Sequence, residues 1–129
     1  MRARWWLLAL ALGLGPAAQA QTGERTRFDC DGRSAALFAV PGSHSHPPYP
    51  AISQRLGEQG ISVLRVGIDR SGAVEAAAML TSSGSNRLDT AAQDWVRRNW
   101  RWQANSMPCR SMTTIVTIQW RLVDAAPTP

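Results

Sequence analysis

Two cysteines carry the most specific chemistry in the chain. Cys30 and Cys109 are its only cysteines, and they stand near opposite ends of the sequence. The C-x-x-C spacing that marks a redox pair is absent. In an oxidising compartment, two isolated cysteines form a disulfide by default. We therefore expect a structural disulfide between Cys30 and Cys109.

A second group of residues has the chemistry of metal ligands. His44-Ser45-His46 supplies two imidazoles, and Asp29 and Asp31 supply two carboxylates. Both kinds of group bind zinc. The histidines lie in a Pro-rich stretch, however, where a His-x-His motif is more often solvated. We expect no metal site, and a metal protein or enzyme built on these residues stays as an alternative.

The sequence offers no pattern of covalent catalysis. A nucleophile elbow needs Gly-x-Ser-x-Gly, which is absent, and Ser83-Gly84 is better explained as a turn into a helix. Asp69 is likewise expected to be a turn residue. Stacking of a ligand on tryptophan is the remaining alternative, but core packing is the better prediction for these side chains. They are Trp95, Trp100, Trp102 and Trp120. We expect no enzyme, no cofactor and no small-molecule substrate.

The N-terminus has the three parts of a secretory signal. Arginines at positions 2 and 4 precede an apolar run of ten residues over 5–14, and Ala18-Gln19-Ala20 is a cleavage site. A helix of that length does not cross a hydrocarbon core about 30 Å thick. We predict that residues 1–20 are removed before Gln21 and that the protein is periplasmic. An uncut membrane anchor is the alternative.

The charge of the chain does not indicate a nucleic-acid partner. The net charge is +5, and the basic residues are all arginines. They are spread along the sequence, whereas a nucleic-acid surface needs basic residues clustered with aromatics on one face. We therefore expect no nucleic-acid partner.

The elements that position these residues form one body over 49–123. An extension over 21–48 precedes this body, and a tail over 124–129 follows it. Within the extension, 28–40 holds a short apolar stretch, which we expect to be a strand pinned by Cys30. The prolines and the glycine of 41–48 predict an extended loop.

Two helices are predicted in the body. Pro50 suits the first turn of a helix that Gly60 ends. Ile52 and Leu56 are four apart and share one face of this helix. Asn86 is expected to be the N-cap of the second helix, with an acidic capping partner three residues later and an apolar stripe along one face.

Three strands are predicted beside these helices. β-Branched residues predict a strand over 61–68. The turn over 69–72 then leads to a returning strand over 73–81, so that the two form a hairpin. Residues 112–122 alternate between apolar and polar side chains, which is typical of a strand with one face on a core and one in water. The sequence therefore predicts an α+β fold, in which two helices pack on one face of a three-stranded antiparallel sheet. The last strand is expected at an uncovered edge of that sheet.

Several short motifs occur in a recognisable order between 47 and 122. They are Tyr49-Pro50, Gly57 and Gly60, Val66-Gly67-Ile68-Asp69 with Gly72, Ser82-Ser83-Gly84, Leu88-Asp89 with Ala91-Ala92, and Trp100-Arg101-Trp102. No single motif is specific, but their order and spacing are. In this respect the chain resembles the TonB C-terminal domain family.

The resemblance implies a periplasmic module that binds proteins and is linked to TonB-dependent outer-membrane transport. In that family, a short segment of the receptor adds a strand to the edge of the last strand, and the segment before the Tyr-Pro pair also contacts the receptor. The implied partner is an outer-membrane receptor or another strand-donating periplasmic protein, and a homodimer stays open. The implied partner-binding residues are His46, Pro47, Tyr49, Pro50, Thr113, Ile115, Thr117, Gln119 and Arg121.

Three features depart from the family pattern. His46 stands where the best-known members have Gln, and no proline follows Trp102. A family energy transducer also keeps a membrane helix, which engages a proton-driven motor complex, and a long Pro-rich arm. Here a cleavable signal and the extension over 21–48 precede the body. We therefore expect a soluble strand-accepting adaptor, and a membrane-anchored energy transducer is the alternative.

Overall fold

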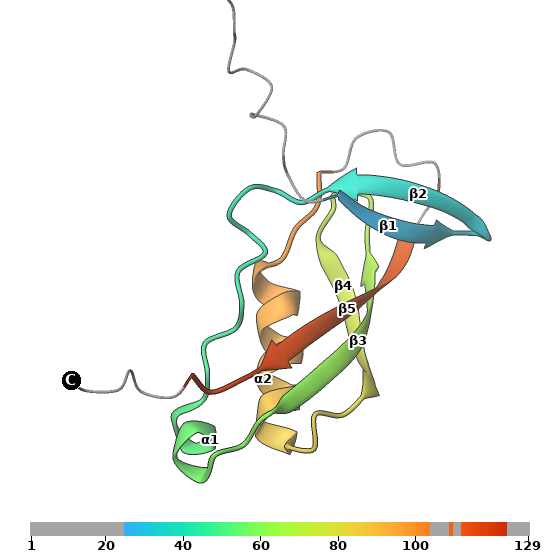
Figure 1. Ribbon diagram of the computed structural model, residues 1–129. Helices are drawn as coiled ribbons and strands as arrows, with labels where there is room; N and C mark the ends of the chain where they lie inside the picture. The colour runs from blue at the N-terminus through green and yellow to red at the C-terminus, as the bar shows by residue number, and fades with distance from the viewer. Residues whose placement is uncertain (1–24, 104–108, 110–111, 124–129) are drawn as a thin grey trace, which may run out of the picture.

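The computed structural model describes residues 25–103, 109 and 112–123 (Figure 1). The signal peptide predicted over 1–20 and the tail over 124–129 lie outside the described residues. The elements are β1 (Arg25–Cys30), β2 (Arg33–Phe38), α1 (Ala51–Leu56), β3 (Gly60–Ile68), β4 (Val74–Thr81), α2 (Asn86–Asn99) and β5 (Met112–Trp120). Within the described ranges, no helix has the length and apolar character needed to cross a bilayer.

The strands form one antiparallel sheet of five, in the order β2-β1-β5-β3-β4, with α2 packed on one face (Figure 1). The α+β class is confirmed, and so are the three strands predicted in the body. The prediction of a three-stranded sheet is wrong, because the extension contributes β1 and β2. The last strand is therefore not the edge strand of the sheet. It lies between β1 and β3.

The β1–β2 hairpin replaces the single strand expected over 28–40. Its turn is Asp31-Gly32, and both residues have positive φ, 54° and 82°. Two successive positive φ angles define the tight turn that matches the twist of a two-residue hairpin, and Asp-Gly is a preferred sequence for it. The Asp29 carboxylate accepts a hydrogen bond from the Gly32 N–H at 3.0 Å and supports the turn.

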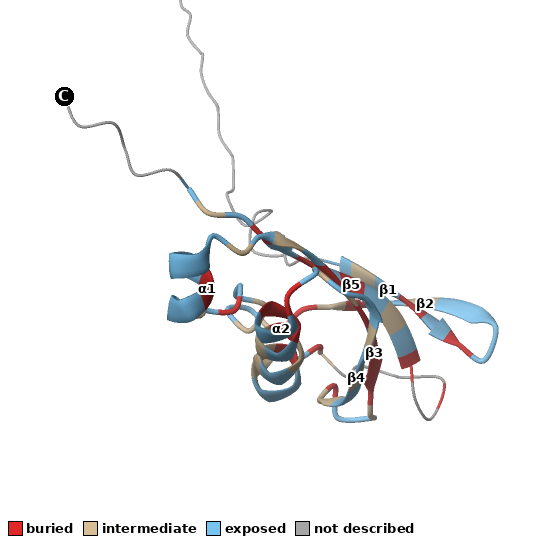
Figure 2. Cartoon of the chain, turned by 90° about the horizontal axis from the view of Figure 1, so that it is seen from below, coloured by how far each residue is buried: buried red, intermediate tan, exposed pale blue. Residues whose placement is uncertain are grey.

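The first helix is shorter than predicted and does not cover the sheet. α1 ends at Leu56, with Gly57 as its C-cap at φ 69°. Ile52 is 48% exposed and Leu56 is 62% exposed, so the face expected in the core is largely in solvent (Figure 2). Gly60 is needed for another reason, since a Cβ there would lie 2.2 Å from the Ser83 carbonyl oxygen.

The second helix packs on the sheet as predicted, but its N-cap is one residue earlier. The Ser85 hydroxyl, not Asn86, accepts from the Leu88 N–H, at 3.3 Å. Leu88, Ala92 and Val96 are fully buried on the sheet side. The helix is amphipathic, and its apolar stripe supplies part of the core.

Residues 101–103 tie the two borders of the sheet together. Trp102 forms an isolated bridge with Ala39, just after β2, and its N–H donates to the Gly72 carbonyl in the β3–β4 turn at 3.0 Å. Its side chain is 1% exposed and meets Phe28 edge-on at 5.2 Å. The prediction of core packing is therefore confirmed for Trp102.

The close approach at Gly72 makes a testable prediction about stability. Gly72 has φ 86°, and a Cβ there would lie 1.9 Å from the Trp102 carbonyl oxygen. Gly42 has a similar φ of 80° but open space around it. We expect Gly72→Ala to lower the free energy of unfolding by about 3 kcal/mol or more, and Gly42→Ala by about 1 kcal/mol, since only the first adds a clash to the backbone strain. Urea unfolding measures both, and equal losses would contradict the clash.

The predicted disulfide is present. Cys30 at the end of β1 bonds Cys109, three residues before β5, with an S–S distance of 2.05 Å. Both cysteines are buried. The bridge therefore fixes the β1–β2 hairpin to the start of the last strand.

Candidate partner-binding site

The side chains of β5 alternate as the sequence predicts. Val116, Ile118 and Trp120 are buried on the side of α2. The other face carries four residues of this strand that were predicted to bind a partner, and Arg121 follows directly after the strand; all five are exposed. They are Thr113, Ile115, Thr117, Gln119 and Arg121. This face of the sheet, which α2 does not cover, is called the open face below.

The two borders of β5 are paired to very different extents. With β3, it keeps register from Gly60↔Trp120 to Ile68↔Met112 without a shift. With β1, the described register is the single pair Asp29↔Thr113. β5 starts beside the end of β1, and the two antiparallel strands separate along β5 (Figure 1). Beyond Thr113, the border of β5 that faces away from β3 therefore pairs with no other strand among the described residues. We call it the outer edge.

The direction of the backbone groups along the outer edge follows from one contact. The Gln119 carbonyl accepts a hydrogen bond from His46 Nε2 at 2.6 Å, so it points away from β3. In an antiparallel pair, residues alternate between directing both backbone groups to the partner and directing both away. The register with β3 has no shift. Ile115 and Thr117 therefore also direct their N–H and C=O groups to the outer edge.

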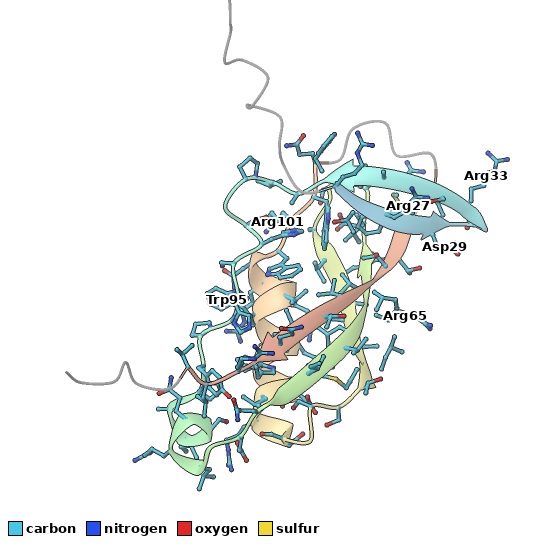
Figure 3. The ribbon with its side chains drawn as sticks, viewed as in Figure 1. Arg27, Asp29, Arg33, Arg65, Trp95 and Arg101 are labelled. Carbon is cyan, nitrogen blue, oxygen red and sulfur yellow. A yellow bond between two sulfur atoms is a disulfide. The ribbon has the colours of Figure 1, made fainter. Side chains whose placement is uncertain are left out.

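Residues 43–50 form an extended segment, which we call the strap, held along α2. The Ser45 carbonyl accepts hydrogen bonds from the indole N–H groups of Trp95 and Trp100, each at 2.9 Å. Figure 3 shows the Trp95 side chain beside α2 on the side of the strap. The His44 ring stacks on Trp100 at 4.3 Å with an interplanar angle of 13°. Trp95 and Trp100 are half-buried, so they hold the strap, whereas Trp102 and Trp120 fill the core.

The strap brings its predicted binding residues to the end of β5. The His46 ring meets Trp120 edge-on at 5.0 Å, and the Tyr49 ring does so at 5.2 Å. Pro47 is buried and Pro50 is the N-cap of α1. His46, Tyr49 and the end of β5 are thus one continuous surface, although they lie about 70 residues apart in the chain.

The two ring nitrogens of His46 both face carbonyl oxygens. Nδ1 lies 2.8 Å from the Pro47 oxygen, and Nε2 lies 2.6 Å from the Gln119 oxygen. A neutral imidazole has one N–H and donates to one of them, whereas an imidazolium donates to both. The His46 side chain therefore links the strap to the backbone of β5 by a hydrogen bond, beside the ring contacts with Trp120.

The Tyr49 hydroxyl donates to the Glu58 carbonyl and fixes the strap to the loop after α1. Burial raises the pKa of Tyr49 above its usual value, and the Glu58 carboxylate adds to the increase. The phenol is therefore protonated at neutral pH and able to donate.

The residues of the alternative metal site are not brought together. The His44 ring packs against Trp100 and Trp102, while the His46 ring packs against Trp120. Asp29 supports the hairpin turn instead. Among the residues that the structure describes, no group of three His, Cys, Asp or Glu side chains is placed to hold a metal ion.

A buried carboxylate anchors Trp120 behind the outer edge. The Asp89 carboxylate accepts hydrogen bonds from the Ser62 hydroxyl at 2.8 Å, from the Ser83 N–H at 2.9 Å and from the Ser82 hydroxyl. The Ser62 oxygen in turn accepts from the Trp120 indole N–H at 3.1 Å. Asp89, expected as a capping residue on α2, is instead the centre of a network between α2, β3 and β5.

This network predicts an acid-sensitive stability. Burial raises the pKa of Asp89, but the hydrogen bonds from the serines outweigh burial, and the pKa lies below its ordinary value of 3.8. The stabilisation is therefore complete above that value and is lost as the pH falls through the lower pKa of the folded state. We expect urea unfolding to show a smaller loss of stability between pH 6 and pH 3 for Asp89→Asn than for the unchanged chain. Parallel curves would contradict this assignment.

Sequence reasoning missed the side of the site that the hairpin supplies. The Thr114 hydroxyl donates to the Arg27 carbonyl at 2.7 Å, where the β1–β5 ladder ends. A groove of about 430 Å³ opens there between the hairpin and the start of β5. The alternation in 25–30 and the Asp31-Gly32 pair were the signals that predict this hairpin.

The chain is similar to known proteins over most of this region. Residues 45–122 match the family described as Gram-negative bacterial TonB protein C-terminal. Protein TonB of Neisseria gonorrhoeae is 43% identical over 65 residues, which cover 50% of this chain and 23% of that protein. Protein TonB of Neisseria meningitidis serogroup C is 42% identical over 65 residues, with the same shares. The chain thus spans less than a quarter of the length of these curated relatives.

Proposed function

The chain belongs to the TonB C-terminal family, and from this premise we propose that it is a periplasmic protein-binding module that receives an extended partner strand on the outer edge of β5. The partner we propose is an outer-membrane TonB-dependent receptor or another strand-donating periplasmic protein. The role is binding, not catalysis.

One observation supports this proposal most directly, namely the direction of the backbone groups on β5. Ile115 and Thr117 direct their N–H and C=O groups away from β3, towards a border where β1 has already separated. An added strand satisfies such groups with main-chain hydrogen bonds, each contributing about 0.5–1.5 kcal/mol net. The open-face side chains beside them then distinguish between partners.

The strap limits the length of that edge. β1 occupies it at Thr113, and His46 occupies the carbonyl of Gln119. A partner strand that extends beyond Thr117 must therefore replace the His46 contact. β1 is held by the disulfide, so the single imidazole is the easier of the two to displace.

An NMR titration with N-terminal peptides of outer-membrane receptors tests the proposal. We expect amide shifts over 113–121 and at His46, with little change over β4 and α2. A peptide of the same sequence, N-methylated at alternate residues, is the matched control, because it keeps its side chains but cannot form the ladder. Binding of receptor peptides that leaves 112–121 unshifted would count against strand addition at this edge.

We further propose that residues 1–20 are removed, so that the module acts as a soluble adaptor. The alternative, a membrane-anchored energy transducer working with a proton-driven motor complex, needs those residues to stay in place. The mass of the protein recovered from its native compartment separates the two, because the processed chain begins at Gln21.

A further inference from the structure

The fold gathers arginines that are far apart in the sequence. Arg27 on β1 is exposed, between the buried Phe28 and half-buried Thr26, and Arg65 on β3 is the register partner of Ile115. Arg33 begins β2 at the other side of the hairpin turn. Figure 3 shows these three arginines, with Asp29, coming from three strands around the start of β5.

The groove between the hairpin and β5 connects these arginines to the outer edge. Arg27 and Arg33 line it from the hairpin side, and Thr113, Thr114 and Ile115 line it from β5. Ile115 is 51% exposed there. A strand that adds to β5 beside Ile115 and Thr117 therefore lies next to Arg27. Arg65 lies on β3, on the other side of β5 from the added strand, and faces the same open face.

The arginines at this entrance outnumber the acidic residues that line it within the described part of the chain. None of the three arginines lies within 4.0 Å of a carboxylate there, whereas Arg87 pairs with Glu58 at 3.3 Å on the other side of the molecule. Asp29 is the one acid that lines the groove, and its carboxylate already accepts the Gly32 N–H. A groove lined mainly by positive charge raises the local concentration of anionic partners and their association rate.

We propose that the outer edge of β5 selects an extended partner segment with acidic side chains at the positions that face the open face, and that Arg27, with Arg33 and Arg65, recognises them. This inference rests on the proposed strand addition and specifies the partner's chemistry. Main-chain pairing with Ile115 and Thr117 holds the strand, and the arginines distinguish an acidic strand from a neutral one.

Two synthetic peptides test the inference on the full mature chain. One is an extended segment of alternating apolar residues and Glu, and the other carries Gln in place of every Glu. We expect the Glu peptide to bind about tenfold more tightly at low salt, and this advantage to shrink strongly near 0.5 M salt, because exposed charges are screened over about 10 Å or less. Fluorescence anisotropy measures both dissociation constants.

A matched pair of variants then locates the effect. Arg27→Gln removes a charge at the groove, whereas Arg97→Gln removes the same charge from the exposed side of α2. We expect Arg27→Gln to weaken the Glu peptide about three- to tenfold and to leave the Gln peptide unchanged, with Arg97→Gln altering neither. Equal binding of the two peptides at 113–121, or equal effects of the two variants, would overturn the acidic preference and leave strand addition standing.

Two other outcomes are informative. If neither peptide shifts the amides of β5, strand addition fails and the inference fails with it. If anionic phosphatidylglycerol vesicles bind the chain through Arg27 and the Glu peptide does not, the arginines serve a membrane surface and the proposal is overturned.

Discussion

Replacing Thr117 with proline is expected to abolish partner-strand binding while the domain stays folded. Thr117 directs its N–H to the outer edge, not to β3, so the loss of this donor leaves the β3–β5 ladder complete. Its side chain is exposed. Proline is tolerated in a strand where its missing N–H faces the unpaired side. The same ring blocks the approach of another backbone.

The expected loss of affinity is at least about tenfold, since one main-chain hydrogen bond contributes about 0.5–1.5 kcal/mol and the ring also displaces the neighbouring pair. Thr117→Val is the matched control, because it keeps the N–H and a branched side chain. Ile118→Pro removes a donor that faces β3, and we expect it to destabilise the domain by about 3 kcal/mol or more. Titration with the receptor peptide and urea unfolding separate these three cases. Unchanged binding by Thr117→Pro would move the site to β2 or β4.

Those two border strands are less suited to receive a partner. On β4, the Gln93 side chain of α2 donates to the Ala77 carbonyl at 2.9 Å and occupies the edge. Past the end of β2, Ala39 pairs with Trp102. Side-chain and loop contacts of this kind are common ways to protect a sheet edge. On the outer edge of β5, the His46 side chain has the same role among the residues that the structure describes.

The body of the domain could be predicted from local patterns. The alternation in 112–122 predicted which side chains of β5 are buried. The apolar stripe through Leu88, Ala92 and Val96 predicted the face of α2 that packs on the sheet. These patterns can be detected because each element buries one face, so that its apolar residues recur with the period of a helix or a strand. The Cys30–Cys109 bridge followed from chemistry and compartment alone.

The arrangement of the site could not be predicted in the same way. α1 was expected to pack because Ile52 and Leu56 share a face, yet both side chains are largely exposed in the part of the chain that the structure describes. The hairpin was missed because 28–40 holds one short apolar stretch, which was interpreted as one strand. The structure instead divides this region between β1 and β2. The arginines around the groove are scattered in the sequence, and only the pairing of β1 beside β5 brings them together. Contacts between distant segments leave no local period to detect.

Removing the disulfide is expected to be the second large effect, and to act on stability more than on strand binding. Cys30 and Cys109 are 79 residues apart. The chain-entropy account gives at most about 4–5 kcal/mol for a loop of this length. The double variant Cys30→Ser, Cys109→Ser should lose much of that in urea unfolding, which is a large part of the 5–15 kcal/mol typical of a small domain. A loss under about 1 kcal/mol would show that hairpin packing alone anchors β1.

The same variant distinguishes the two halves of the proposed site. The direction of the Thr117 N–H and C=O groups depends on the ladder between β5 and β3. This ladder runs along the whole length of both strands and does not involve the disulfide. Arg27 and Arg33 depend on the hairpin, which joins β5 through the pair Asp29↔Thr113 and through the disulfide. We therefore expect the double variant, studied at low temperature where it is folded, to bind the Gln peptide as before and to lose most of the preference for the Glu peptide. Loss of both peptides in a folded variant would mean that the hairpin shapes the edge itself, whereas a retained preference would place the selecting charges on β3 rather than on β1.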